Sequence, residues 1–94
     1  MALDFEWDEN KAMANKRDHG VSFEEAKTVF DDPLSITIPD PAHSVGESRF
    51  VQLGESSSGN LLVVSFTERR AKIRIISSRE PTRSERRQYE QGSF

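Results

Sequence analysis

Residues 49–78 have the sequence RFVQLGESSSGNLLVVSFTERRAKIRIISS, and this stretch decides the fold. Three runs in it, at residues 49–55, 61–67 and 72–78, are rich in Val, Ile, Phe and Thr, which favour strands. The segments between the runs are short and polar, so neighbouring strands are expected to be antiparallel. A fourth run lies upstream at residues 34–38, where apolar and polar residues alternate. We therefore predict a four-stranded antiparallel meander.

Helices are predicted before and after these strands in the sequence, from the residues that typically begin and end a helix. The first runs from Asp8 toward His19, with Gly20 as a left-handed stop. The second and third, at residues 22–33 and 82–91, each open with a capping box, in which a Ser or Thr and a Glu satisfy each other's backbone donors. The order of two N-terminal helices, four strands and a C-terminal helix predicts an α+β fold.

The composition indicates one small domain. The chain has 94 residues, of which 34% are hydrophobic and 31% charged, so we expect a thin core and a single domain over residues 1–94. It has no cysteine, which excludes disulfides, thiolate zinc sites and thiol nucleophiles. No apolar run approaches the roughly 18 residues of a membrane helix, and residues 1–7 lack a secretion signal. We therefore expect a cytoplasmic protein.

The formal net charge of −3 conceals an uneven distribution. Residues 1–47 carry four Lys or Arg and eleven Asp or Glu, a charge of −7, whereas residues 48–94 carry nine and five, a charge of +4. The basic half suggests an anionic partner. The other interpretation is that the two halves attract each other within the fold, and composition leaves both open.

The spacing of the strands predicts how they pair. If residues 68–71 form a four-residue turn, Phe66 lies opposite Ile73. The loop after residue 55 then places Phe50 opposite Phe66, so these side chains share one apolar face.

The other face of the sheet is expected to gather cations. In the predicted register Arg49, Lys72 and Arg74 converge at one end of it. The opposite end of this face is apolar, and we expect the C-terminal helix to cover it. The apolar residues there are Leu53, Val63 and Ile76.

The histidines do not predict a metal site or a cofactor. The two of them, His19 and His43, are 24 positions apart and have no ligand spacing. His19 precedes the predicted stop glycine, where a cation interacts favourably with the helix dipole. His43 lies in a polar loop and is predicted to be a surface residue. A glycine-rich phosphate loop and a Gly-x-Ser-x-Gly motif are also absent from the sequence.

Converging cations suit phosphate groups, because guanidinium donors match phosphate oxygens. A ribonuclease that uses the ribose 2′-hydroxyl as its nucleophile needs such cations, a base and an acid. Glu68 and Glu47 are the nearby carboxylates, and each is a candidate for the base or for orienting an arginine. The alternative is that Lys72 and Arg74 belong to a solvated strand face. Arg83 is expected to face solvent or a partner.

Several short motifs together resemble the BrnT toxin family, and the likeness extends over nearly the whole chain. The motifs are Phe5-Glu6-Trp7-Asp8, His19-Gly20-Val21-Ser22-Phe23-Glu24-Glu25-Ala26, Asp40-Pro41-Ala42-His43-Ser44, Thr67-Glu68-Arg69, Ile73-Arg74-Ile75-Ile76-Ser77-Ser78-Arg79 and Glu85-Arg86-Arg87. The resemblance implies a RelE-like ribonuclease toxin of a type II toxin–antitoxin pair, which inhibits translation by cutting RNA. It also implies a BrnA-like antitoxin whose ribbon–helix–helix part binds operator DNA.

The resemblance also implies which residues act. Catalytic roles fall on Arg49, Glu68, Arg74 and Arg79, and RNA-binding roles are predicted for Glu47, Lys72 and Arg83. Arg74 and Arg79 are expected to grip the scissile phosphate, with Arg49 in support and Glu68 as the base or orienting group. Relatives are expected to have a histidine where this chain has Phe66. A second hypothesis is therefore a catalytically inactive module that binds the antitoxin or RNA.

Overall fold

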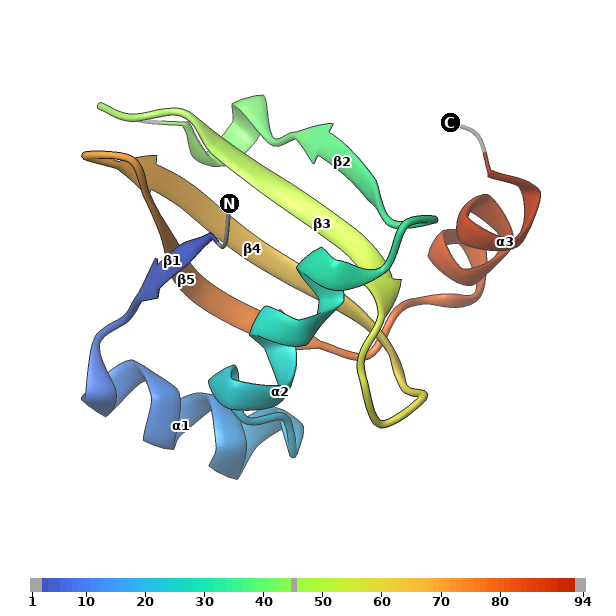
Figure 1. Ribbon diagram of the computed structural model, residues 1–94, viewed down its shortest axis with the longest axis horizontal. Coiled ribbons are helices and arrows are strands. Elements are labelled where there is room, and N and C mark those ends of the chain that lie inside the picture. The colour runs from blue at the N-terminus through green and yellow to red at the C-terminus, as the bar shows by residue number, and fades with distance from the viewer. Residues whose placement is uncertain (1–2, 45, 93–94) are drawn as a thin grey trace.

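The computed structural model describes residues 3–44 and 46–92, which form one sheet with helices packed on it (Figure 1). The elements are β1 (Asp4–Glu6), α1 (Glu9–His19), α2 (Phe23–Lys27), the 3-10 helix η1 (Thr28–Asp31), β2 (Ile36–Pro39), the 3-10 helix η2 (Pro41–His43), β3 (Arg49–Glu55), β4 (Leu61–Arg69), β5 (Lys72–Arg79) and α3 (Arg83–Gln91). The strands lie in the order β1-β5-β4-β3-β2. Within the described ranges, no helix has the length and apolar character needed to cross a membrane.

The predicted four-stranded antiparallel sheet is wrong, because the sheet has five strands and is mixed. β1 precedes α1 and pairs in parallel with β5, so that Asp4 lies opposite Lys72 and Phe5 opposite Ile73. Three residues are too few to show a strand period, and the pairing joins segments that are far apart in the chain. The RelE-like description, which was tied to helices followed by four antiparallel strands, has no support in this topology.

The predicted register is confirmed between β3 and β4 but wrong between β4 and β5. Phe50 lies opposite Phe66, as expected. The turn after β4 has two residues rather than four, Arg70 and Ala71. Their φ angles of 50° and 66° lie in the left-handed region, which suits a two-residue hairpin turn because it matches the right-handed twist of the strands. Phe66 consequently lies opposite Ile75, two positions further along β5 than predicted. A shift of two residues keeps these side chains on their predicted faces.

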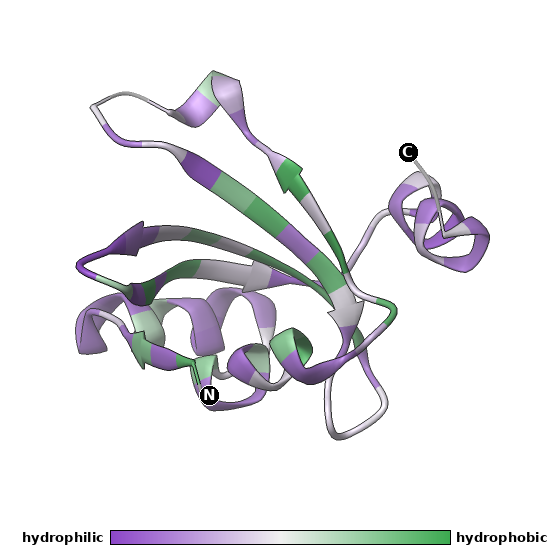
Figure 2. Ribbon diagram, turned by 45° about the horizontal axis from the view of Figure 1, so that its top comes forward, coloured by the Kyte–Doolittle hydropathy of each residue, from purple (hydrophilic) through white to green (hydrophobic). Residues whose placement is uncertain are grey.

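The core lies between one face of the sheet and the helices α1 and α2 (Figure 1). Phe66 is 4% exposed, stacks on Phe50 with ring centroids 5.6 Å apart, and meets Phe30 edge-on at 5.0 Å. Position 66 is thus a core position whose side chain points away from the opposite face of the sheet. Figure 2 shows the contrast between the hydrophobic segments of the strands and the mainly hydrophilic α1 and α3. The buried core residues are Val21, Phe23, Ala26, Val29, Leu62, Val64 and Ile75.

Among the described elements, a helix covers the opposite face of the sheet at one end only. Tyr89 of α3 packs there on the cluster of Leu53, Leu61 and Val63, which confirms that the C-terminal helix covers Leu53 and Val63. Ile76, the third residue of the predicted apolar end, is not part of this cluster. The Tyr89 hydroxyl also donates a hydrogen bond to Asp32 Oδ2 at 2.6 Å. We call the uncovered remainder of this face, near the β4–β5 turn, the open end.

Candidate functional site

A row of polar and charged side chains crosses the open end from β1 to β2. Arg74 lies opposite Glu6 on one side and Thr67 on the other, and Thr67 lies opposite Arg49. The backbone N–H of Asp40 donates to the carbonyl of Arg49 at 2.9 Å, which adds Asp40 to the row. Side chains directly opposite one another in a sheet project from the same face. We call these five residues the arginine row.

The centre of the arginine row is a buried threonine between two arginines. Thr67 is 1% exposed, and its hydroxyl donates to the carbonyl of Ser48 at 2.7 Å, so its position is fixed. Neighbouring strands lie about 4.8 Å apart, which puts the backbones of Arg49 and Arg74 about 10 Å apart. Their long side chains can close this gap and hold one anionic group above Thr67.

The two arginines differ in their pairing. Arg74 Nη1 lies 2.9 Å from Glu6 Oε2, which orients the guanidinium and leaves its other nitrogens available as donors. Within the described residues Arg49 bonds through its backbone only, where its N–H donates to Ser44 Oγ at 2.9 Å. The Arg74 guanidinium is therefore pre-oriented by Glu6, and the Arg49 guanidinium is available to a ligand.

A second row lies one step nearer the β4–β5 turn. Lys72 lies opposite Arg69, whose guanidinium bonds to both carboxylate oxygens of Glu47 at 3.0 and 3.1 Å. The hydrogen bonds from Arg69 lower the pKa of Glu47, burial opposes them, and the charges of Arg69, Arg49 and Arg74 lower it further. A carboxylate with a lowered pKa is a weak base, so this geometry suits Glu47 to orienting Arg69.

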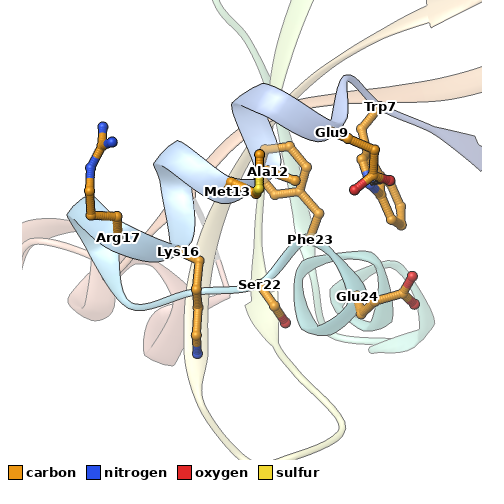
Figure 3. Close-up of a pocket in the computed structure, with 9 residues that line it drawn as sticks. All are labelled: Trp7, Glu9, Ala12, Met13, Lys16, Arg17, Ser22, Phe23 and Glu24. Atoms are coloured by element: carbon orange, nitrogen blue, oxygen red, sulfur yellow. Dashed lines mark hydrogen bonds between the residues drawn. The ribbon is translucent and has the colours of Figure 1, made fainter.

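Two hollows in the described part of the chain are lined by more than one cation, and the cations converge in only one of them. The hollow beside the arginine row, of about 330 Å³, is lined by Glu6, Arg69, Arg70 and Lys72. The other, of about 450 Å³, lies between α1 and α2 (Figure 3). Figure 3 shows an apolar centre, Lys16 and Arg17 at one end, and Glu9 and Glu24 at the other. This second hollow does not offer converging donors to an anion. In the described part of the chain, no three His, Asp or Glu side chains gather closely enough to hold a metal ion.

Four of the seven predicted site residues come together at the open end, namely Arg49, Arg74, Lys72 and Glu47. Glu68 does not join them. It lies opposite Ile73, so its exposed side chain projects from the face that carries α1 and α2.

Arg79 and Arg83 lie at the α3 end of the molecule. Arg79 lies five positions after Arg74, which is about 16 Å at the usual rise of a strand. The Arg79 guanidinium bonds to both carboxylate oxygens of Glu85 at 2.8 and 2.9 Å and so fastens α3 to β5. Arg83 is exposed in the first turn of α3.

The link between Arg79 and Glu85 predicts acid-sensitive docking of α3. The hydrogen bonds from Arg79 and Thr82 outweigh burial and lower the pKa of Glu85 from 4.5 to about 2. The folded-state pKa is thus below the unfolded one, so the stabilisation is present above pH 4.5 and is lost as the pH falls toward 2. Because Arg79 is 43% exposed and water screens the pair, we expect Glu85→Gln to cost about 1 kcal/mol at pH 7.

Urea unfolding of the wild type and Glu85→Gln at pH 7 and pH 3 measures this effect. The stability difference is expected to shrink at pH 3, and an equal difference at both pH values would contradict the assignment. Glu90→Gln, an exposed change on the same helix, is the control and is expected to show little effect at either pH.

Four members of the site were missed from the sequence, namely Glu6, Asp40, Thr67 and Arg69. Glu6 was missed because β1 was not predicted. The signal for it lies in the partner strand, since Asp4 and Glu6 carry charges opposite to those of Lys72 and Arg74.

Guanidinium groups gathered at the open end are donors whose geometry suits a phosphate group. They belong to a small domain in which helices pack on a mixed five-stranded sheet. Residues 7–85 match the family model described as the ribonuclease toxin BrnT of type II toxin–antitoxin systems. The chain belongs to this family, which confirms the resemblance noted in the sequence.

Structural comparison agrees at the level of the fold. The crystal structure of the Brucella abortus ribonuclease toxin BrnT, at 1.1 Å resolution, matches with a TM-score of 0.67 and 21% sequence identity. The match covers 87% of this chain and 100% of that one. No curated protein sequence matches the chain significantly.

Proposed function

We propose that this protein cleaves RNA without a metal ion, by attack of a ribose 2′-hydroxyl on the adjacent phosphate. Membership of the BrnT family supplies the ribonuclease class. The observation that carries the mechanism is the pair Arg49 and Arg74 on either side of Thr67. Two guanidinium groups in that position supply the positive charge that a pentavalent phosphorus transition state requires.

The geometry suggests a different role for each of the charged residues at the open end. Arg74 and Arg49 hold the non-bridging oxygens of the scissile phosphate, while Lys72 contacts a neighbouring phosphate. Glu6 and Glu47 orient Arg74 and Arg69 through the ion pairs described above. Without such fixed partners, long side chains lose more conformational entropy when they bind an anion.

Three predicted roles have less geometric support. Catalysis by Glu68 or Arg79 and RNA binding by Arg83 stay predictions. The bonds between Arg79 and Glu85 favour a structural role for Arg79.

The biological setting follows from the family. Membership of a type II toxin–antitoxin system implies an antitoxin partner. We propose that this partner is a BrnA-like ribbon–helix–helix protein, through which the complex contacts operator DNA. RNA cleavage in the cytoplasm then inhibits translation until the antitoxin neutralises the toxin.

Incubation of the purified protein with RNA in excess EDTA tests the chemistry. Cleavage is expected to persist and to leave 2′,3′-cyclic phosphate and 5′-hydroxyl ends, because the 2′-oxygen is the nucleophile. Gel analysis measures the cleavage, and direct labelling with polynucleotide kinase detects the 5′-hydroxyl ends. Loss of cleavage in EDTA would contradict metal independence, and RNA binding without cleavage would favour an inactive binding module.

A further inference from the structure

A histidine–aspartate pair stands at the β2 side of the arginine row. His43, the last residue of η2, has Nδ1 2.9 Å from Asp40 Oδ2. A carboxylate accepts hydrogen bonds, so in this pair Nδ1 carries the proton and donates it. The His43 side chain is 68% exposed, compared with 24% for that of Asp40. The ring is thus held at one nitrogen, while Nε2 remains an acceptor on an accessible surface.

Three hydrogen bonds fix this pair to the first residue of β3. The Asp40 N–H donates to the Arg49 carbonyl at 2.9 Å, and the Arg49 N–H donates to Ser44 Oγ at 2.9 Å. Ser44 Oγ in turn donates to the Asp40 carbonyl at 2.7 Å. The loop that carries His43 is therefore tied to Arg49 rather than free to move independently of the arginine row.

The strand register puts the pair on the same face as the arginines. Pro39 lies opposite Phe50, whose ring stacks in the core, so Asp40 and Arg49 are the next pair and project from the other face. Because the Asp40 carboxylate bonds to His43, the imidazole is held at the β2 side of that face.

We propose that His43 is the general base of the cleavage reaction and that Asp40 is its positioning residue; the inference rests on the function proposed above. An imidazole is the side chain best suited to accepting a proton near neutral pH. Glu68 lies on the other face and Glu47 is held by Arg69. Among the carboxylate and imidazole groups at the open end, His43 combines a fixed orientation with a free acceptor atom.

The proposed step conserves atoms and charge. His43 Nε2 takes the proton of the ribose 2′-hydroxyl, and the 2′-oxygen forms a bond to phosphorus. The bond between phosphorus and the 5′-oxygen breaks, and the leaving oxygen takes a proton from water. Asp40 stabilises the imidazolium until it returns its proton to the solvent. The products are a 2′,3′-cyclic phosphate and a 5′-hydroxyl.

The test compares the two histidines of the chain. His43→Ala is expected to lower kcat by about 100-fold or more, because a general base contributes at least that much. Its affinity for an RNA with a 2′-deoxy substitution at the cleavage site is expected to stay unchanged, since the phosphate contacts remain. Added imidazole is expected to restore part of the rate, which a purely structural loss would not allow. His19→Ala is the matched control, because His19 is exposed at the end of α1, and it is expected to cleave at the wild-type rate.

A second variant examines the positioning residue. Asp40→Asn is expected to lower kcat by about 10-fold with KM and thermal stability unchanged, because the amide keeps the shape but does not stabilise the imidazolium as a carboxylate does. His43→Ala with wild-type kcat, or with reduced kcat that imidazole does not restore, would overturn the inference. If Arg74→Ala abolishes cleavage while His43→Ala does not, the inference fails alone and the proposed ribonuclease stands. A wild-type protein that cleaves no RNA would overturn both.

Discussion

Replacing Arg74 by alanine is expected to lower the rate of RNA cleavage by about 1,000-fold. Arg74 lies between Glu6 and Thr67 in the arginine row, and its side chain is 29% exposed. A partly buried cation is screened less by water and interacts more strongly with an anion than a fully solvated one. Single-turnover cleavage of a short fluorescent RNA measures the effect on the chemical step.

Two further variants show whether the loss of cleavage is specific to the position and the guanidinium group of Arg74. Arg17→Ala removes the same charge from α1, where the Arg17 side chain is 74% exposed, and is expected to change the rate by less than about 2-fold. Arg74→Lys keeps the charge but loses the planar fork, so an intermediate rate is expected. Circular dichroism must show that Arg74→Ala is folded, because the change leaves Glu6 unpaired. A folded Arg74→Ala protein that cleaves at the wild-type rate would contradict the site.

The second large effect is on stability. Phe66→His is expected to lower the free energy of unfolding by about 3 kcal/mol at pH 7.5, because a smaller polar ring would replace a buried aromatic one. The neighbours Phe30 and Phe50 carry no polar side-chain atom that could pair with the imidazole. Burial disfavours the charged form of a histidine, so its pKa would be lower in the folded than in the unfolded protein. The loss should therefore grow as the pH falls below about 6.5.

Urea unfolding at pH 7.5 and pH 5.5 measures both parts of this prediction. Phe66→Leu is the control, for which we expect a cost of about 1.5 kcal/mol without added pH dependence. Cleavage by folded Phe66→His is expected not to exceed that of the wild type, because position 66 points into the core. An increase in cleavage, or an unchanged stability, would show that this side chain reaches the open end.

The face assignments were predictable because alternation along a strand is a local property. Arg49, Lys72 and Arg74 were correctly placed together although the β4–β5 register was wrong, because the error is two residues between Phe66 and the turn, where these side chains lie. Glu68 was misplaced because β4 was predicted to end too early. It was assigned to a turn, but it continues β4 by one position beyond Thr67 and therefore projects from the opposite face.

The turn after β4, the strand β1 and the pair of Asp40 and His43 could not be predicted, because they depend on contacts that a local sequence pattern does not contain. The turn at Arg70 and Ala71 adopts positive φ angles without the Asn or Gly that usually signals them. β1 is recognisable only from its partner strand. Unless β1 is predicted, the ion pair between Glu6 and Arg74 cannot be predicted either. Asp40 and His43 are brought together by η2, a single turn of helix within a loop.

The pairing of β1 with β5 determines when the site exists as well as where. Glu6 and Arg74 are 68 positions apart, so their contact forms only when the chain has been made as far as residue 74. During synthesis an emerging chain cannot complete the row until residue 74 has left the ribosome, and long-range pairing is slow to form. We therefore expect a nascent chain that ends before residue 74 to lack the complete arginine row, so that RNA cleavage begins only after β5 has paired with β1.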